Sequence, residues 1–307
     1  MKKITQTIVR SLIGIIGAGA AFMLAPGASA QNLFVSDFGN GSVYEYTSGG
    51  VQSTFATGFD NLGGIAFDNA GDLYVADYSL DTVTKITPGG VRSAVATGLS
   101  NPTAMVFNNA GDLFVANLSG NNITEVTPGG AQSTFANVDS PNGLIFNNTG
   151  DLFVSSKGDG TITEITPGGV QSPFATGLST PWEMVFDNAG NLLVGNDDNY
   201  IPGGGSITKI TPGGVESIFI SGLTIPGEMA FNNAGDLLVP QSRSDEVLEF
   251  SSTGSPLQTI TISGAQDLDG LAFQPVPEPS TFALMGVGLA GFLAYARRSQ
   301  KQIQTNQ

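Results

Sequence analysis

Residues 101–117 read Asn-Pro-Thr-Ala-Met-Val-Phe-Asn-Asn-Ala-Gly-Asp-Leu-Phe-Val-Ala-Asn, and this stretch decides the fold. Two apolar runs, at 104–107 and 113–116, flank a short polar segment that contains Gly111. Glycine readily adopts the positive φ that a tight turn between antiparallel strands requires. The stretch therefore predicts a β-hairpin.

The hairpin sequence recurs along the chain. Its turn, Asn-Ala-Gly-Asp or a close variant, places glycine at positions 71, 111, 150, 190 and 235. A second marker, Thr-Pro-Gly-Gly, ends at positions 90, 130, 169 and 214, with a form lacking proline that ends at 50 and a degenerate one near 254. Six units of about 41 residues fill the body of the chain, 31–275, and this period is typical of propeller blades.

Each unit contains four expected strands, which in one copy lie at 104–107, 113–116, 123–127 and 131–136. The Asn-Ala-Gly-Asp turn and the Thr-Pro-Gly-Gly turn both specify antiparallel pairing of the strands that they connect. The runs are nearly continuously apolar, which indicates sheets covered on both faces. We predict an all-β, six-bladed β-propeller with four antiparallel strands per blade. A right-handed β-helix is the alternative, although its repeats are shorter.

The order of the strands predicts how the ring closes. The first expected strand, at 33–35, is the second strand of its unit, and the last, at 270–273, is a first strand without a partner. The two strands therefore belong to the last blade, which the N- and C-terminal strands complete together. Closure of this kind removes free sheet edges.

The repeated unit, Pro-x-Gly followed by apolar residues and Phe-Asp-x-x-Gly-Asp-Leu, resembles NHL-repeat and SMP-30/gluconolactonase-like six-bladed propellers. The resemblance covers the whole body and implies a fold more than an activity. The SMP-30/gluconolactonase family binds a divalent cation through Glu, Asn and Asp. In that family the Glu comes first in the chain, whereas here Asn142 precedes Glu183 and Glu228, so the lactonase mechanism is in doubt. Virginiamycin B lyase, a similar propeller, uses a catalytic His.

Composition excludes several chemistries. The 307-residue chain contains no His and no Cys, so it cannot build Ser-His-Asp or Cys-His nucleophilic sites, zinc fingers or iron–sulfur centres. The lyase mechanism is excluded for the same reason. The formal net charge of −15 argues against a nucleic-acid partner, which needs a Lys/Arg surface. The remaining candidates for chemistry are carboxylates, amides, hydroxyls and the backbone.

The first thirty residues, 1–30, have the features of a secretory signal peptide. Lys2, Lys3 and Arg10 precede an apolar stretch at 12–25, and a small-residue site ends at Ala30. We expect export through the Sec machinery and cleavage between Ala30 and Gln31. A short membrane anchor is the alternative.

Residues 276–307 form a second terminal segment. Pro277-Glu278-Pro279 precedes an apolar stretch at 282–296, which Arg297 and Arg298 follow. The three features closely resemble the PEP-CTERM sorting signal of exported bacterial proteins. The resemblance implies processing by an exosortase near the proline motif, after transient anchoring in the inner membrane through a short transmembrane helix. The family is associated with envelopes that produce exopolysaccharide, so the expected location is the cell surface or the extracellular matrix.

Polar residues occur where the first strand of each unit begins and where the second ends, positions that meet on one rim of a propeller. The first group includes Asn142, Glu183, Glu228 and Asp269. Oxygen ligands of this kind suit Ca²⁺ or Mg²⁺, so we predict a divalent-metal site at the mouth of the central tunnel. Solvated side chains without a ligand are the alternative. For the second group, which includes Asp37, Asp77 and Asn117, side chains that cap their own turns are favoured.

Three further residues on that rim are candidate ligand-binding residues. Trp182, the only tryptophan, could stack on a sugar ring or pack in the axial core. Asn196 and Asp197 begin a long acidic loop that could cover a ligand or be a tolerated surface excursion. We therefore predict an exported binding or scaffold module with extracellular polysaccharide as a candidate partner. A metal-dependent hydrolase of lactonase type is the alternative.

Overall fold

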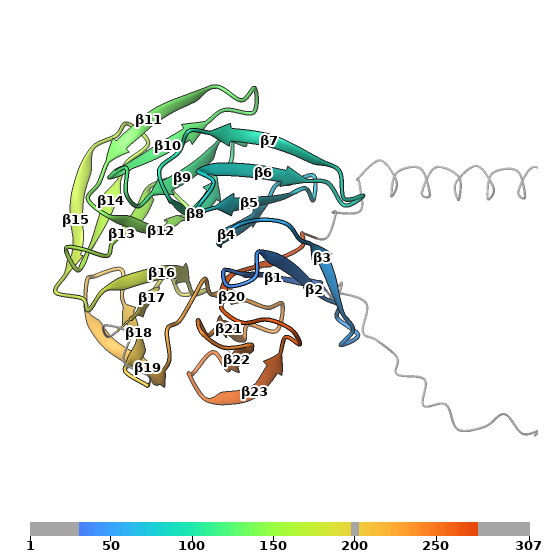
Figure 1. The fold of residues 1–307 in the computed structure, drawn as a ribbon. Helices are drawn as coiled ribbons and strands as arrows, with labels where there is room; N and C mark the ends of the chain where they lie inside the picture. The colour runs from blue at the N-terminus through green and yellow to red at the C-terminus, as the bar shows by residue number, and fades with distance from the viewer. Residues whose placement is uncertain (1–30, 198–202, 276–307) are drawn as a thin grey trace, which may run out of the picture.

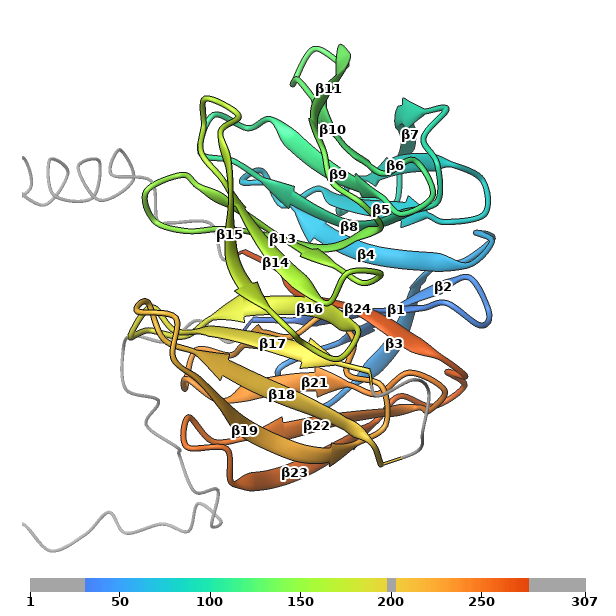
Figure 2. The ribbon, with the colours of Figure 1, turned by 90° about the vertical axis from the view of Figure 1, so that its left-hand side faces the viewer.

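The computed structural model describes residues 31–197 and 203–275, and within them it contains 24 β-strands and no helix (Figure 1). The strands form six four-stranded sheets that stand side by side around a central axis (Figures 1 and 2). The predicted six-bladed β-propeller is confirmed. The signal segment through Ala30, loop residues 198–202 and the segment 276–307 lie outside the described residues.

The first three blades in chain order have the following strands. Blade 1 consists of β4 (Leu62–Phe67), β5 (Leu73–Asp77), β6 (Thr82–Ile86) and β7 (Arg92–Thr97). Blade 2 consists of β8 (Pro102–Phe107), β9 (Leu113–Asn117), β10 (Asn122–Val126) and β11 (Gln132–Asn137). Blade 3 consists of β12 (Pro141–Phe146), β13 (Leu152–Ser156), β14 (Thr161–Ile165) and β15 (Gln171–Thr176).

The other three blades complete the ring. Blade 4 consists of β16 (Pro181–Phe186), β17 (Leu192–Asn196), β18 (Gly205–Ile210) and β19 (Glu216–Leu223). Blade 5 consists of β20 (Ala230–Phe231), β21 (Leu237–Pro240), β22 (Glu246–Phe250) and β23 (Pro256–Thr261). Blade 6 consists of β24 (Leu268–Phe273), β1 (Leu33–Asp37), β2 (Ser42–Tyr46) and β3 (Gln52–Ala56).

Blade 6 closes the ring as predicted, because β24 pairs with β1 in antiparallel register. At the end of this pair the backbone N–H of Gln274 donates to the carbonyl of Asn32 at 3.0 Å. In blade 1 the corresponding bond, from Asp68 N–H to the Asp72 carbonyl, closes the hairpin between the first two strands. The two ends of the described body therefore take the place of a hairpin, on the rim where first strands end.

Side chains stabilise that hairpin in the other blades. In blade 1 the Asp68 carboxylate accepts hydrogen bonds from the backbone N–H groups of Ala70 and Asp72, both at 2.9 Å. Gly71 has a φ of 83°, which a residue with a side chain rarely adopts. Asn108 holds the blade 2 hairpin in the same way. The turn residues thus specify the antiparallel pairing locally.

Six hydrophobic clusters fill the seams between neighbouring blades. Phe114 illustrates the repeated packing, because its ring meets Phe135 of its own blade and Phe146 of the next one edge to face. The centroid distances are 4.9 Å and 5.1 Å, in the range that favours aromatic pairs. The core is therefore a ring of seams that holds the central strands in place.

The prediction of sheets covered on both faces holds best for the second strand of each blade, where every residue of β9 is buried. It does not hold for the fourth strand. Residues 132–134 at the start of β11 are exposed, as is Val91 at 67% just before β7. The reason is that the fourth strand forms the outer edge of its blade. No helix among the described residues is long and apolar enough to cross a membrane.

Candidate functional site

A β-bulge shapes the start of the first strand in most blades. In β12, Pro141 pairs with Ser156 and Leu144 with Val154, so Asn142 and Gly143 fall outside the regular register. The same shift occurs in β4, β8 and β16. Bulges redirect side chains, and they are frequent beside functional sites. Here they turn two consecutive residues per blade toward the axis.

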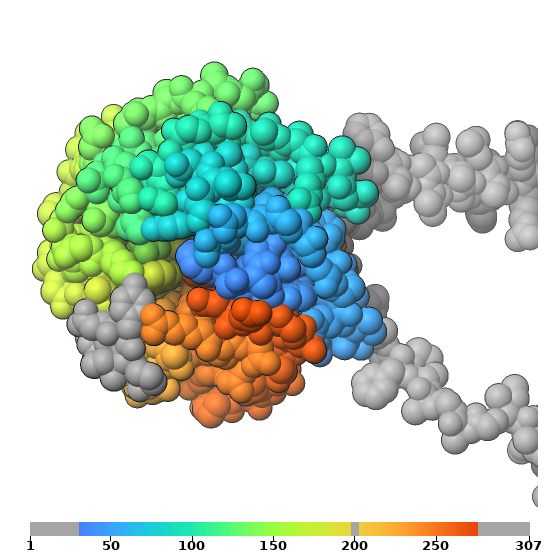
Figure 3. Space-filling model, in the orientation of Figure 1, coloured from blue at the N-terminus to red at the C-terminus, as the bar shows by residue number. Residues whose placement is uncertain are grey.

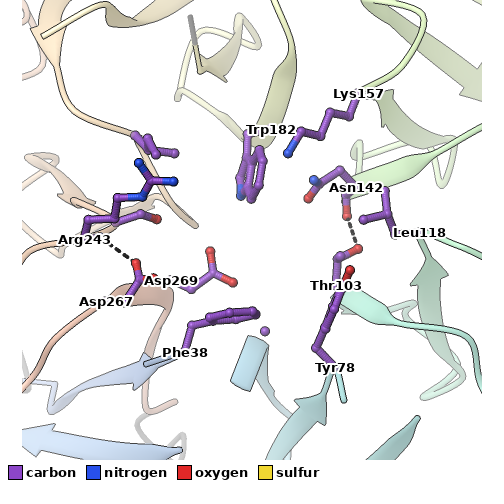
Figure 4. A pocket seen from close by; sticks show the side chains of 13 residues that line it. Phe38, Tyr78, Thr103, Leu118, Asn142, Lys157, Trp182, Arg243, Asp267 and Asp269 are labelled. Atoms are coloured by element: carbon purple, nitrogen blue, oxygen red, sulfur yellow. Dashed lines mark hydrogen bonds between the residues drawn. The ribbon is translucent and has the colours of Figure 1, made fainter. Parts of the chain in front are cut away.

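The first residue of each bulge lines a cavity of about 310 Å³ at one mouth of the axis (Figure 4). These residues are Gly63, Thr103, Asn142 and Trp182, and Asp269 of β24 joins them. Asn142, Trp182 and Asp269, predicted separately for metal and ligand binding, are thus brought together from three blades. This rim lies opposite the rim where β24 ends at Phe273 and β1 begins at Leu33.

The cavity wall contains residues that the sequence reasoning missed. They come within three positions of the end of the second strand of their blades: Phe38, Tyr78, Leu118, Lys157, Ser242 and Arg243. The prediction pointed to the residue one position earlier, such as Asp37 or Asp77. An aromatic residue at the same place in two repeats, Phe38 and Tyr78, was the signal that could have identified this ring.

The strand-end residues themselves hold the backbone. Asp37 accepts hydrogen bonds from Gly39 N–H at 2.8 Å and Gln266 N–H at 2.8 Å, and Asp77 accepts from Asp60 N–H at 2.9 Å. Asn117 donates to Thr124 Oγ1 at 2.9 Å. Asp37 and Asp77 cap their own turns, as favoured for this group, since Asp77 also accepts from Leu80 N–H at 3.0 Å. Asn117 instead contacts side chains of β10.

Asn196 and Asp197 are buried and do not line this cavity. The Asn196 amide donates to the Val194 carbonyl at 3.1 Å and to Thr208 Oγ1 at 3.0 Å. The backbone N–H of Asp197 donates to the Thr180 carbonyl at 3.2 Å. All three hydrogen bonds lie within blade 4. The rest of the predicted lid, residues 198–202, lies outside the described residues.

The second residue of the bulge lies deeper, and in this layer two side chains are large. Glu183 comes from blade 4 and Glu228 from blade 5, whereas the other blades contribute Gly64, Ala104, Gly143 and Gly270. A Cβ added to Gly143 would lie 2.9 Å from Glu183 Oε2 and 2.5 Å from the Trp182 carbonyl. The small residues therefore leave the space that the two glutamates occupy.

Glu228 reaches from blade 5 to the two blades that follow it around the ring. Its Oε2 accepts hydrogen bonds from the backbone N–H groups of Leu271 in blade 6 and Ile65 in blade 1, each at 3.2 Å. Its own N–H donates to the Asp269 carbonyl at 2.8 Å. Glu228 also lines a second cavity, of about 630 Å³, which contacts the hairpins of blades 1 and 2 on the opposite rim.

The central carboxyl groups are hard to ionise. Burial raises the pKa of Glu228 to about 8, although its two backbone hydrogen bonds counteract the rise. Burial, and then the charges of Glu228 and Asp269, raise the pKa of Glu183 well above its usual range. Burial and the charge of Asp267 raise the pKa of Asp269 to about 7, against a hydrogen bond from Trp182 and the positive charge of Lys157. Near neutral pH much of this layer is therefore protonated.

Three contacts fix Trp182 in the cavity. Besides its hydrogen bond to Asp269, its ring carries the Lys157 ammonium 3.7 Å from the ring centroid, a cation–π contact (Figure 4). The Trp182 carbonyl accepts a hydrogen bond from the Ser155 hydroxyl at 2.5 Å, and the same hydroxyl accepts from Gly143 N–H at 2.8 Å. Ser155 thus connects the bulges of blades 3 and 4.

The four residues predicted to hold a cation lie in two layers, with Asn142 and Asp269 in the cavity wall and Glu183 and Glu228 beneath them. Among residues 31–197 and 203–275, no three Asp or Glu side chains are grouped closely enough to hold a metal ion. As they stand, these residues do not form a carboxylate centre that fits Ca²⁺ or Mg²⁺. The cation site stays a prediction, and its binding would have to compete with protons.

Comparison with known proteins adds one decisive observation on the part of the chain beyond the propeller. The model of the PEP-CTERM protein-sorting motif matches residues 275–298. The chain carries a PEP-CTERM sorting motif. The match includes Pro277, Glu278, Pro279, Arg297 and Arg298, the residues from which the signal was predicted. A search of the curated proteins found no match to the chain.

Solved structures share the fold of the propeller at low sequence identity. The nidogen/laminin complex contains a chain with a TM-score of 0.71 and 14% identity over 81% of this chain and 99% of that one. Virginiamycin B lyase from Staphylococcus aureus has a TM-score of 0.59 and 15% sequence identity, over 76% of this chain and 81% of its own. A gluconolactonase-type protein has a TM-score of 0.56 and 15% sequence identity, over 82% of this chain and 90% of its own. These likenesses confirm the predicted relation to NHL-like and gluconolactonase-like propellers at the level of fold.

Proposed function

We propose that the protein is an exported binding module of the bacterial cell surface or matrix, which an exosortase sorts and which binds extracellular polysaccharide at the Trp182 cavity. The observation that carries the proposal is a cavity with aromatic and polar walls on a chain with a PEP-CTERM motif. The motif indicates export with transient anchoring through the C-terminal segment. The cavity supplies a place for a ligand.

The composition of the cavity wall supports glycan binding. Phe38, Tyr78 and Trp182 provide aromatic surface, while Asn142 and Thr103 provide polar groups. Ligand sites commonly combine apolar walls with a few polar groups that fix orientation. An aromatic ring next to an amide suits a sugar, which has apolar C–H faces and a hydroxyl edge.

The charge of the body is consistent with a place outside the cell. Three basic residues in each terminal segment, and Glu278, lie outside it, which leaves 5 Lys/Arg against 25 Asp/Glu in 31–275, a net charge of −20. Such a surface favours solubility and disfavours adhesion to anionic membranes. Divalent cations collected on it could bridge the protein to acidic polysaccharide.

The alternative is a divalent-metal-dependent hydrolase with Asn142, Glu183, Glu228 and Asp269 as ligands. The fold relatives do not favour it, because they include a lyase and a nidogen/laminin complex as well as a gluconolactonase-type protein. Turnover of a lactone by the wild-type protein, lost in Glu228→Gln, would support the hydrolase against our proposal.

The proposal is tested on protein recovered from its own cells. The intact mass reports both cleavages, after Ala30 and near Pro277-Glu278-Pro279. Co-sedimentation with the cells' extracellular polysaccharide should retain the wild-type protein. Trp182→Ala should bind the polysaccharide at least about tenfold more weakly, which corresponds to a loss of about 1.4 kcal/mol of binding free energy. Equal retention of both proteins would place the binding site outside the Trp182 cavity, and retention of neither would reject the binding module in favour of a plain scaffold.

A further inference from the structure

The Asn142 side chain is the most informative group in the cavity. It is 1% exposed, yet neither its Oδ1 nor its Nδ2 has a hydrogen-bond partner among the described residues. Its backbone is held, because the Thr103 hydroxyl donates to the Asn142 carbonyl at 3.0 Å. Figure 4 shows the carboxamide on the cavity wall between Trp182 and Leu118. A buried amide without partners lowers stability, so a ligand that satisfies both atoms would relieve that cost.

The chemistry of the carboxamide defines what such a ligand must offer. Oδ1 only accepts and Nδ2 only donates, and the two atoms lie side by side on one edge of the group. Two hydroxyls on adjacent carbons match this edge, because one can donate to Oδ1 while the other accepts from Nδ2. A carboxylate or phosphate presents only acceptors and leaves Oδ1 without a donor. A trans secondary amide points its N–H and C=O in opposite directions and can engage only one of the two atoms.

The charges around the cavity favour a neutral ligand. Lys157 and Arg243 are balanced in number by Asp267 and Asp269 in the same wall. Several of these groups already have roles inside the protein, since the Lys157 ammonium lies over the Trp182 ring and Asp267 accepts from the Arg243 backbone N–H at 2.5 Å. Because the pKa of Asp269 is about 7, this carboxyl is partly protonated near neutral pH. The net charge of the wall then lies between zero and one positive charge, which attracts an ion only weakly.

The remaining wall suits the apolar face of a ring. Phe38 lies across the cavity from Asn142, whereas the Trp182 ring lies beside it (Figure 4). Phe38 and Tyr78 contact each other edge to face at 5.7 Å between centroids. A pyranose ring presents hydroxyls at its edge and C–H groups on its faces. Its hydroxyl edge fits Asn142 while its C–H face packs on these side chains.

We propose that the cavity binds a neutral sugar residue through a vicinal diol, with the Asn142 carboxamide as its two-point partner and the aromatic side chains against its C–H face. This inference rests on the proposed function and specifies the ligand class. Trp182 is the only tryptophan of the chain, so its fluorescence reports directly on the cavity.

The experiment titrates the protein, as recovered from cells, with methyl glycosides of neutral hexoses and with their O-methylated forms that lack a free diol. The extracellular polysaccharide is titrated before and after periodate oxidation and borohydride reduction, which cleave vicinal diols. We expect saturable Trp182 fluorescence changes with the diol-bearing probes, and at least about tenfold weaker binding once the diol is blocked or cleaved. Binding of the polysaccharide alone, with the same periodate sensitivity, would identify an internal sugar of the polymer as the source of the diol.

Asn142→Leu is the decisive variant because leucine has the same branched arrangement of side-chain heavy atoms and no polar atoms. It should weaken binding at least about tenfold while its melting temperature stays equal to or above that of the wild type. Asn109→Leu, at an exposed asparagine on the opposite rim, is the matched control and should bind normally. If Asn142→Leu does not fold, the comparison of intact with methylated glycosides still decides the question.

The outcomes separate this inference from the proposed function. Polysaccharide binding that survives periodate, that prefers a uronic acid to neutral hexoses, or that is unchanged in Asn142→Leu would overturn the diol inference and leave the binding module intact. Absence of binding to every glycan would overturn both.

Discussion

The hydroxyl of Ser155, in the second strand of blade 3, donates a hydrogen bond to the carbonyl of Trp182 in the first strand of blade 4. The same oxygen accepts from Gly143 N–H. Ser36 makes the equivalent bridge between Gly270 of blade 6 and Gly63 of blade 1, at 2.7 Å and 2.8 Å. Buried hydroxyls thus connect strand bulges across two of the seams, one of them directly beneath the cavity.

Ser155→Ala should destabilise the protein by about 1–3 kcal/mol, because Gly143 N–H and the Trp182 carbonyl would lose their shared partner in a buried place. Urea unfolding followed by circular dichroism measures the change. Ser172→Ala, at an exposed position in β15, is the control and should be neutral. An equal effect of both substitutions would show that Ser155 has no special role in the seam.

Gly143→Ala should cost about 1–3 kcal/mol, because a Cβ at this position meets the Trp182 carbonyl and Glu183 Oε2 at distances that require movement. Gly89→Ala serves as the comparison, since its nearest neighbour would lie at 3.8 Å. Thermal melting of the two variants gives the result. Unchanged melting of Gly143→Ala would mean that the glutamate layer has room to spare.

Stability should fall as pH rises through the folded-state pKa of Glu228, about 8. The sign follows from linkage, because the folded-state pKa of Glu228 lies above the ordinary pKa of a glutamate. The stability that protonated Glu228 contributes is complete below this ordinary pKa, and it is lost as the carboxyl ionises in the folded protein. Melting temperature measured from about pH 5 to about pH 9 should therefore decline.

Glu228→Gln should flatten this decline, because glutamine still accepts from Ile65 and Leu271 N–H but does not ionise. Glu216→Gln, on an exposed part of β19, should leave the slope unchanged. A decline of the same steepness in Glu228→Gln would assign the pH dependence to other groups.

Calcium, if it binds between the two layers, should raise the melting temperature more at about pH 9 than at about pH 6, because protons and the cation compete for Glu228 and Asp269. Scanning fluorimetry with calcium and with chelator measures the difference. The cation site would be ruled out if calcium had no effect at either pH, or an effect that Glu183→Gln and Glu228→Gln leave intact.

The period of the repeats predicted the blades, the hairpins and the closure by β24 and β1, because each depends on local turn residues and strand order. The convergence of Asn142, Trp182 and Asp269 followed from the same order. The wall residues Phe38 and Tyr78 were missed because side chains alternate along a strand, and the turn that follows decides which of two adjacent residues faces the axis. The division of the acidic residues into two layers depends on the bulges, which have no sequence signal of their own beyond a pair of small or polar residues.

The bond between Gln274 and Asn32 also has a consequence for orientation. The sorting motif begins at residue 275, directly after this bond, so a chain held by that segment is held from the rim opposite Trp182. The mouth of the Trp182 cavity would then open away from the membrane, and the molecule would present it to the surroundings both before and after the tether is cut.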